Sequence, residues 1–229
     1  PALLYKKEFA DRISVGNFDD DLPKIKNTDW IIEVVVERLD IKKSVYEKIE
    51  QFRKPGTLVS SNTSGIPINM LVEGRSADFK HYFAGTHFFN PVRYLPLLEI
   101  IPTKDTDAEI VKFYMEYGAK FLGKTTVLAK DTPAFIANRI GVFSIMNLLH
   151  NVKSIGLNVT EVDKLTGPVI GRPKSATFRT ADVVGLDTLV HVANGVHGSG
   201  VEDEQFKGTF VLPDYINFMM ENKWLGSKT

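Results

Sequence analysis

One histidine and one glutamate stand in neighbouring apolar runs of this chain of 229 residues. His87 lies near the end of the first run, just before Phe-Phe-Asn-Pro, and Glu99 lies inside the next run. A neutral imidazole accepts a proton near neutral pH, since its unperturbed pKa is about 6.5, and a carboxylate on its second ring nitrogen fixes its tautomer. We therefore predict that His87 is a general base oriented by Glu99, with the two side chains within hydrogen-bond reach.

A single histidine at the end of a strand is more often a packing or surface residue than a catalytic one. The spacing to Glu99 and the Asn-Pro after His87 favour the catalytic interpretation. The other histidines have no such company and are interpreted as surface or packing residues: His81, His150, His191 and His197.

Two polar segments flank this pair along the chain. Ser60 to Gly65 reads Ser-Ser-Asn-Thr-Ser-Gly at the end of an apolar run, and residues 131–139 read Asp-Thr-Pro-Ala-Phe-Ile-Ala-Asn-Arg. Ligands of open α/β sheets gather outside the carboxyl ends of the strands, which makes the first segment a candidate binding loop. The same residue types also form ordinary turns, and this alternative stays open.

Apolar runs and helical periodicity alternate in the first part of the chain, which is typical of βαβ units. The run Trp30 to Val36 is the strongest strand signal, and its β-branched character predicts a strand covered on both faces. The other expected strands are Arg12 to Val15, Thr57 to Ser61, His81 to Phe88, Leu97 to Ile101 and Thr125 to Ala129. The expected helices are Leu3 to Ala10, Asp40 to the Pro55-Gly56 pair that ends it, Ile68 to Leu71 and Asp105 to Phe121. From Pro133 towards His150 and beyond, the apolar spacing is helical. We expect an α/β domain over residues 1–130 and an all-α domain over residues 131–229.

The composition excludes several classes of function. Lysine plus arginine equals aspartate plus glutamate at 28 each, so no net charge favours nucleic acid or an anionic membrane. The sequence has no cysteine, which excludes disulfides, thiolate nucleophiles and cysteine metal sites, and we expect no metal centre. No apolar run approaches the ~18 residues of a membrane span, and the first residues form no signal peptide. We expect a cytoplasmic protein.

The order and spacing of Ser60 to Gly65, His87 to Pro91, Glu99 and residues 131–139 resemble the L-3-hydroxyacyl-CoA dehydrogenase family. The resemblance extends over almost the whole chain and implies NAD-dependent oxidation of an L-3-hydroxyacyl-CoA to the 3-oxoacyl-CoA in fatty-acid β-oxidation. It also implies a Rossmann-type, doubly wound first domain and a homodimer formed through the helical domain. The segment Gly171 to Asp187 is similar to long bacterial bifunctional proteins, which implies a possible enoyl-CoA hydratase fused to this chain in a longer parent protein.

The resemblance also implies roles for five further residues. Ser64 offers its hydroxyl to the substrate, Asn138 hydrogen-bonds the substrate from the second domain, and Asn62 lies by the nicotinamide ribose or carboxamide. Glu37 and Lys42 lie near the nicotinamide half of NAD. Taken alone, Glu37 to Lys42 also reads as the charged, solvated start of a helix, and this alternative stays open.

The loop that usually binds the dinucleotide pyrophosphate is missing. No Gly-x-Gly-x-x-Gly follows a strand, and the family places that loop and its ribose-binding acid before the point where this sequence begins. We therefore expect an N-terminally truncated, partial Rossmann-type domain that lacks its first strands and binds NAD poorly. Two rival hypotheses stay open: a catalytically idle structural or dimerisation module, and another 3-hydroxyacid dehydrogenase with a Rossmann and a helical domain.

Overall fold

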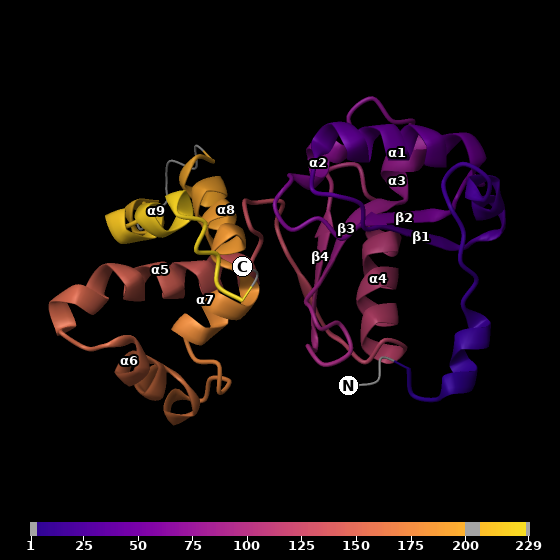
Figure 1. The fold of residues 1–229 in the computed structure, drawn as a ribbon. Helices are drawn as coiled ribbons and strands as arrows, with labels where there is room; N and C mark the ends of the chain where they lie inside the picture. The colour runs from indigo at the N-terminus through magenta and orange to yellow at the C-terminus, as the bar shows by residue number, and fades with distance from the viewer. Residues whose placement is uncertain (1–3, 200–206, 228–229) are drawn as a thin grey trace. The chain divides into compact units, whose positions relative to one another are not determined.

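The protein divides into two compact units in a computed structural model that describes residues 4–199 and 207–227. The first unit is Pro1–Thr132 and the second is Pro133–Thr229. Figure 1 shows the first unit in indigo to magenta and the second in orange to yellow. Each unit has its own core and is described by itself.

A mixed sheet forms the centre of the first unit. Its strands, in spatial order, are β1 (Trp30–Glu33), β2 (Leu58–Ser61), β3 (Phe83–Phe88), β4 (Leu97–Pro102) and β5 (Thr125–Leu128). The pairs β1 with β2, β2 with β3 and β4 with β5 are parallel, whereas β3 and β4 are antiparallel. The α/β class expected from the alternating pattern is thereby confirmed, with one antiparallel pair that the pattern did not predict.

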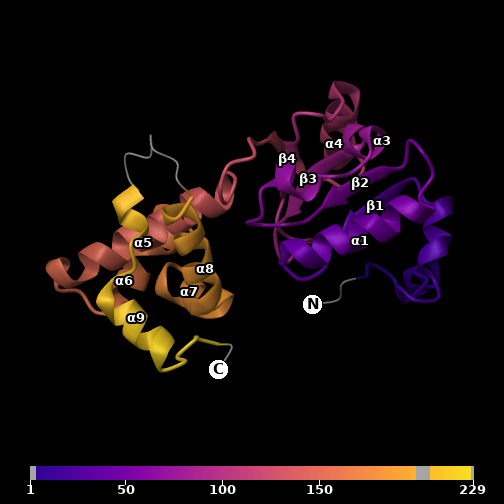
Figure 2. The same cartoon turned by 90° about the horizontal axis from the view of Figure 1, so that it is seen from above.

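Helices cover both faces of this sheet. The helices α1 (Leu39–Phe52), α2 (Ile68–Leu71) and α3 (Ala77–His81) lie on one face, and α4 (Ala108–Lys120) lies on the other, as Figure 1 shows. Figure 2 gives the view from above, with α1 towards the viewer. On the first face the rings of Tyr46, Phe79 and Phe83 contact one another and are buried. On the second face Tyr114 packs against a buried cluster of Ala84, Leu98 and Ile100.

Gly118 explains how closely α4 approaches the sheet. A Cβ atom at this position would lie 2.6 Å from Thr126 Cγ2 and 2.9 Å from Leu98 Cδ2. Both neighbours are side chains of strands under the helix, so any larger residue would push α4 away from its cluster.

Several N-terminal predictions were wrong. Residues 12–15 form no strand, because Lys7–Arg12 is a 3₁₀ helix and the residues after it are extended but exposed, with Val15 at 93%. The strand expected over Trp30 to Val36 ends at Glu33, whose side chain accepts a hydrogen bond from Val35 N. It is also not fully covered on both faces, since Ile32 within β1 is 41% exposed.

The strand expected from His81 begins only at Phe83, because His81 ends the short helix α3. The apolar pattern did not predict α3. Its first turn is capped by Ser76, whose side chain accepts a hydrogen bond from Phe79 N. A helix this short has too few apolar residues to show a helical period, so the sequence pattern did not predict it.

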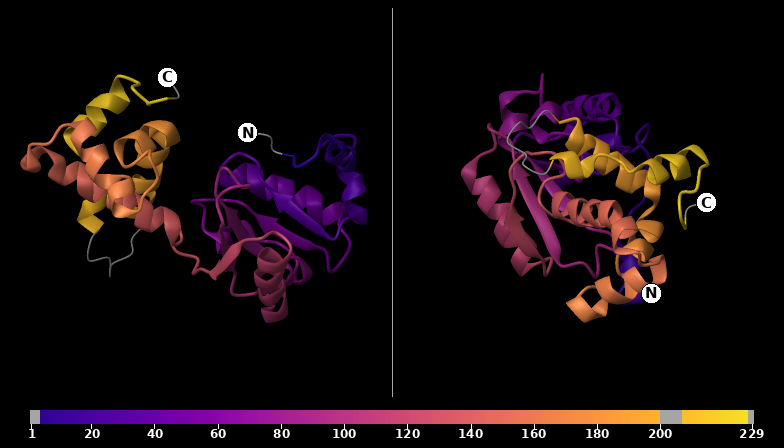
Figure 3. Two further views of the ribbon diagram at one scale, coloured as in Figure 1. Left: turned by 90° about the horizontal axis from the view of Figure 1, so that it is seen from below. Right: turned by 90° about the vertical axis from the view of Figure 1, so that its left-hand side faces the viewer.

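The described residues of the second unit form helices and turns (Figure 3). The helices are α5 (Ala137–Ile155), α6 (Val159–Thr166), α7 (Phe178–Val184), α8 (Leu186–His197) and α9 (Asp214–Glu221). Met146, Leu149, Leu189, Ala193 and Ile216 belong to one buried cluster, which joins α5, α8 and α9.

Helix α5 begins at Ala137 rather than at Pro133. Ala134 and Phe135 have φ angles of 61° and 49°, a left-handed backbone that cannot continue into an α-helix, and both side chains are buried. Across the residues described, no helix has the length and apolar character needed to cross a membrane.

Candidate active site

His87 and Glu99 lie directly opposite each other on β3 and β4. His87 Nδ1 is 2.6 Å from Glu99 Oε2, and the two side chains are only 3% and 0% exposed. The prediction that they lie within hydrogen-bond reach is confirmed. The two residues meet as a cross-strand pair of an antiparallel ladder.

Ser64 occupies the other side of the His87 ring. Its Oγ lies 3.0 Å from His87 Nε2, so both ring nitrogens have a polar neighbour. A carboxylate only accepts hydrogen bonds, which assigns the proton of the neutral ring to Nδ1 and leaves the lone pair of Nε2 facing Ser64. The ring of Phe89 covers the imidazole edge-on at 4.4 Å between centroids.

The loop that carries Ser64 is fastened to Glu37. Glu37 Oε1 accepts hydrogen bonds from Ser64 N and Gly65 N, each at 3.0 Å, and from Thr63 Oγ1. Burial alone would raise the pKa of Glu37, but the bonds from Thr63, Gly65 and Ser64, together with the charge of Lys42, outweigh it and lower the pKa. Glu37 is therefore an anion that organises the loop at the end of β2.

Glu33, a residue that the sequence did not single out, lies behind this loop. Its Oε1 accepts from Lys42 Nζ at 2.8 Å and Val35 N at 2.6 Å, and its Oε2 accepts from Tyr46 Oη at 2.6 Å and Ser61 Oγ at 2.7 Å. The side chains of Glu33 and Lys42 are each 1% exposed. A charged residue inside an otherwise apolar strand was the available signal, because a buried charge requires a partner.

The predicted cofactor residues differ in what they present. Asn62 Oδ1 accepts from Phe88 N at 2.8 Å, and its amide nitrogen takes part in no hydrogen bond found within residues 4–199 and 207–227, so it fits a carboxamide or ribose oxygen. Lys42 binds Glu33 and lies 3.3 Å from Glu37 Oε2. Because the Lys42 side chain is buried, the alternative that it belongs to a solvated helix start is wrong. The contacts of Lys42 described here are with other residues of the same unit.

Asn138 is in the first turn of α5, is partly buried and belongs to the second unit. His81 lies 3.6 Å from Asp107, and His150 Nε2 lies 3.1 Å from Thr209 O. Within the described ranges, no group of three or more histidine, aspartate or glutamate side chains is placed to hold a metal ion.

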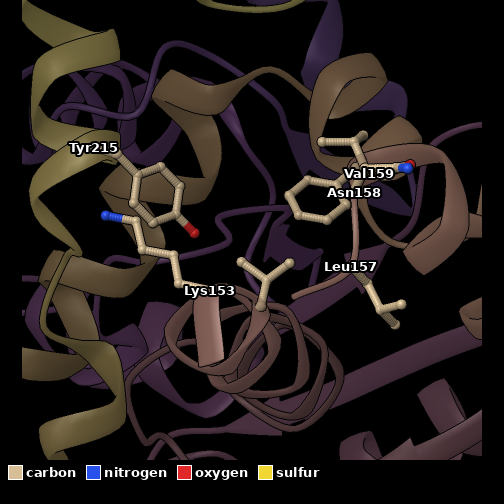
Figure 4. A pocket seen from close by; sticks show the side chains of 7 residues that line it. Lys153, Leu157, Asn158, Val159 and Tyr215 are labelled. Atoms are coloured by element: carbon tan, nitrogen blue, oxygen red, sulfur yellow. The ribbon is translucent and has the colours of Figure 1, made fainter. Parts of the chain in front are cut away.

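The helical unit contains an open hollow of its own. It has a volume of about 310 Å³ and is lined by residues of α5, α6, α7 and α9 and the turn after α5, among them Lys153, Leu157 and Tyr215 (Figure 4). Tyr215 donates its hydroxyl to Leu149 O, and burial raises the pKa of Tyr215. No histidine, aspartate or glutamate is among the residues that line this hollow, whereas His87 has a buried carboxylate partner.

Both units match one family of known proteins. Residues 2–132 match a family model described as 3-hydroxyacyl-CoA dehydrogenase, NAD binding domain, and residues 135–229 match the C-terminal domain of the same family. The first description names NAD, the cofactor that the resemblance implied.

Individual relatives agree with this assignment. A probable 3-hydroxyacyl-CoA dehydrogenase of Bacillus subtilis is 54% identical over 228 residues, which cover 100% of this chain and 29% of the relative. A protein of the same description from Deinococcus radiodurans is 46% identical over 229 residues, 100% of this chain and 65% of the relative. The crystal structure of FadB2 of M. tuberculosis is similar with a TM-score of 0.81 and 29% identity, over 91% of this chain and 70% of that chain.

The chain therefore spans less than two thirds of the length of either of these curated relatives. The family models nevertheless cover nearly all of its residues, in two parts that follow its two units. On these grounds the chain belongs to the 3-hydroxyacyl-CoA dehydrogenase family.

Proposed function

We propose that the protein oxidises an L-3-hydroxyacyl-CoA to the 3-oxoacyl-CoA with NAD as the hydride acceptor, as a step of fatty-acid β-oxidation. The observation that supports this most directly is the buried imidazole of His87. Its Nδ1 is held 2.6 Å from Glu99, and its Nε2 faces the Ser64 hydroxyl at 3.0 Å.

In the proposed mechanism, the C3 hydroxyl of the substrate donates its proton to His87 Nε2. Glu99 stabilises the imidazolium that forms, since its carboxylate already accepts a hydrogen bond from Nδ1. Ser64 donates to the substrate oxygen and orients it against the ring. NAD, when bound, supplies a nicotinamide ring that takes the hydride from C3, with the amide of Asn62 available to its carboxamide or ribose.

Asn138 is proposed to hold the substrate from the helical unit. An amide in the first turn of α5 offers both a donor and an acceptor to a carbonyl or hydroxyl group. Binding by residues of two units would couple catalysis to closure around the substrate.

The test uses the full-length protein and the reverse reaction, reduction of acetoacetyl-CoA followed by the loss of NADH absorbance. His87→Ala should lower turnover by about 10²–10⁴-fold, the range that acid–base groups contribute, while NAD affinity changes little. His150→Ala, a histidine that bonds only a backbone carbonyl near the surface, is the matched control and should retain activity. Unchanged turnover in His87→Ala would remove the residue from the mechanism.

The cofactor site of residues 1–229 by themselves is a separate proposal. The sequence has no Gly-x-Gly-x-x-Gly loop to cradle a pyrophosphate, and Glu37 and Lys42 are engaged with each other and with their neighbours. We expect this stretch to bind NAD weakly, and the idle structural module is the alternative function. Calorimetry against NAD tests the first point, and micromolar affinity would contradict it. Measurable reduction of acetoacetyl-CoA would contradict the second.

Self-association is proposed to occur through residues 168–190 of the helical unit. Val169 and Ile170 are 77% and 56% exposed, and Val183 and Val184 on α7 are 54% and 47% exposed, which is more apolar surface than isolated residues present. Sedimentation should show a dimer, and a monomer at micromolar concentration would defeat the proposal. A fused hydratase and a cytoplasmic location stay predictions that mass analysis and fractionation of the full-length protein can test.

A further inference from the structure

Four residues lie on one face of the sheet as two cross-strand pairs, which are offset because Ser61 is paired with Gly85 and His87 lies two residues further along β3. Glu33 is paired with Ser61 across β1 and β2, and His87 is paired with Glu99 across β3 and β4. Side chains two residues apart on a strand share a face, and α1 contributes Lys42 and Tyr46 to this same face through their bonds to Glu33. The proposed mechanism uses His87 and Glu99 but leaves the buried carboxylate of Glu33 without a role.

Glu33 reaches the Ser64 loop by two routes. The first runs through Ser61, whose Oγ donates to Glu33 Oε2 at 2.7 Å and accepts from Thr63 N at 3.2 Å. The second runs through Lys42, whose Nζ lies 2.8 Å from Glu33 Oε1 and 3.3 Å from Glu37 Oε2. The backbone adds a third link, since Asn62 N donates to Glu33 O at 2.9 Å.

Both side-chain routes end on atoms that fix the position of Ser64. Glu37 Oε1 accepts from Ser64 N and Gly65 N, and Thr63 precedes Ser64 directly. Without Glu33, Lys42 would be drawn towards the single remaining carboxylate, and Glu37 would lose its fixed place under the loop. The loop would then set the Ser64 hydroxyl less accurately against His87 Nε2.

We propose that Glu33 is a positioning residue for the reaction. Together with Lys42 it holds Glu37 against the loop of residues 61–65, and thereby keeps Ser64 Oγ within hydrogen-bond distance of His87 Nε2. This inference rests on the proposed function and deepens it, because Glu33 acts through the loop that carries Ser64.

The experiment compares two Lys–Glu pairs of equal length in the full-length protein. Glu33→Gln alters the buried pair with Lys42. Glu73→Gln alters an exposed pair, in which Glu73 is 61% exposed and its Oε2 lies 2.8 Å from Lys43 Nζ. Glu33→Gln should lower kcat for acetoacetyl-CoA reduction by about 10–100-fold, the scale that small misplacements cost. Glu73→Gln should leave kcat unchanged.

A double-mutant cycle separates positioning from a merely structural loss. If Glu33 acts through Ser64, Glu33→Gln should lower kcat by less than about twofold in a Ser64→Ala background. The limb of the pH profile of kcat/KM that reports His87 should move alike in Glu33→Gln and Ser64→Ala, and should stay in place in Glu73→Gln. An equal loss of kcat in both backgrounds, or an unmoved limb, would overturn the proposal.

If Glu33→Gln does not fold, Ser61→Ala takes its place under the same criteria, because it removes only the hydroxyl between Glu33 and Thr63. The Ser64→Ala arm also distinguishes the two levels of the argument. Full turnover in both Ser64→Ala and His87→Ala would overturn the proposed function and this inference together. A loss in those two variants with none in Glu33→Gln would overturn the inference alone.

Discussion

The two units differ in how many polar and charged side chains they bury. Among the residues that the structure describes, the buried polar and charged side chains lie in the sheet unit with one exception, Thr177. The sheet unit buries Glu33, Lys42, His87 and Glu99, each bonded to another buried or partly buried group. The helical unit instead buries a continuous apolar cluster.

This difference shows that different interactions specify the structures of the two units. A buried charge is tolerated only with partners that replace water, so a unit with several of them is specified by its hydrogen bonds as well as by its packing. An apolar cluster is specified by volume alone and tolerates change as long as the space is filled. Mutations of buried polar groups in the sheet unit should therefore affect turnover as well as stability, whereas mutations in the apolar cluster of the helical unit should affect stability alone.

The largest expected effect is on turnover. Glu99→Gln replaces a fully buried carboxylate with a neutral group of the same shape and should lower kcat by about 10²–10⁴-fold, since the imidazolium of His87 loses its counter-charge. The matched change in the helical unit is Glu161→Gln, at an exposed capping box with Asn158 that glutamine also satisfies. The kcat of Glu161→Gln should equal that of the wild type. A loss of kcat as large as that of Glu99→Gln would contradict the expected difference between the two units.

The second effect is on stability within the sheet unit. Lys42→Met removes the buried partner of Glu33 and should lower the free energy of unfolding by about 3–5 kcal/mol, because it leaves an uncompensated buried charge. Its neighbour Lys43 pairs with Glu73 at the surface, and Lys43→Met should cost about 0–1 kcal/mol. Denaturant unfolding of the two variants measures both values, and equal losses would show that burial does not decide them.

The helical unit should respond to lost volume. Met146 is 0% exposed in its apolar cluster, so Met146→Ala should lower the free energy of unfolding of that unit by about 2–5 kcal/mol. Turnover per folded molecule should not change under conditions where the protein stays folded. Calorimetry and the NADH assay on one preparation measure the stability and the turnover of this variant. A loss of turnover without a loss of stability would contradict the expected difference between the units.

The smallest effect concerns pH. The pKa of Glu37 is lowered in the folded protein, chiefly because the bonds from Thr63, Gly65 and Ser64 outweigh the cost of burial. A lowered pKa contributes stability that is present above the unfolded value of 4.5 and is lost as the pH falls through the folded value. The stability difference between wild type and Glu37→Gln should therefore be largest near neutral pH and shrink below it. A difference that grows in acid would reverse this assignment.

The strands β2, β4 and β5 and the helices α1 and α4 were predicted within a few residues. The helices show the spacing of one apolar face, and the strands are short runs that contain apolar or β-branched residues. Sequence pattern failed at Arg12 to Val15, where the alternating apolar residues Ile13 and Val15 are exposed, and at α3, which begins at a capping residue and has no periodic apolar face. The pair His87 and Glu99 was predictable because residue type and spacing alone pointed to its chemistry.

By itself the sequence determined the class of fold and the family, and it predicted that His87 and Glu99 lie within hydrogen-bond reach, since these depend on local periodicity and on residues close together along the chain. Only the tertiary structure decided that β3 and β4 are antiparallel and that Glu33 lies under the Ser64 loop. The physical reason is distance along the chain. Glu33, Ser61 and His87 stand on three different strands, and hydrogen bonds between them exist only after the sheet has set its register.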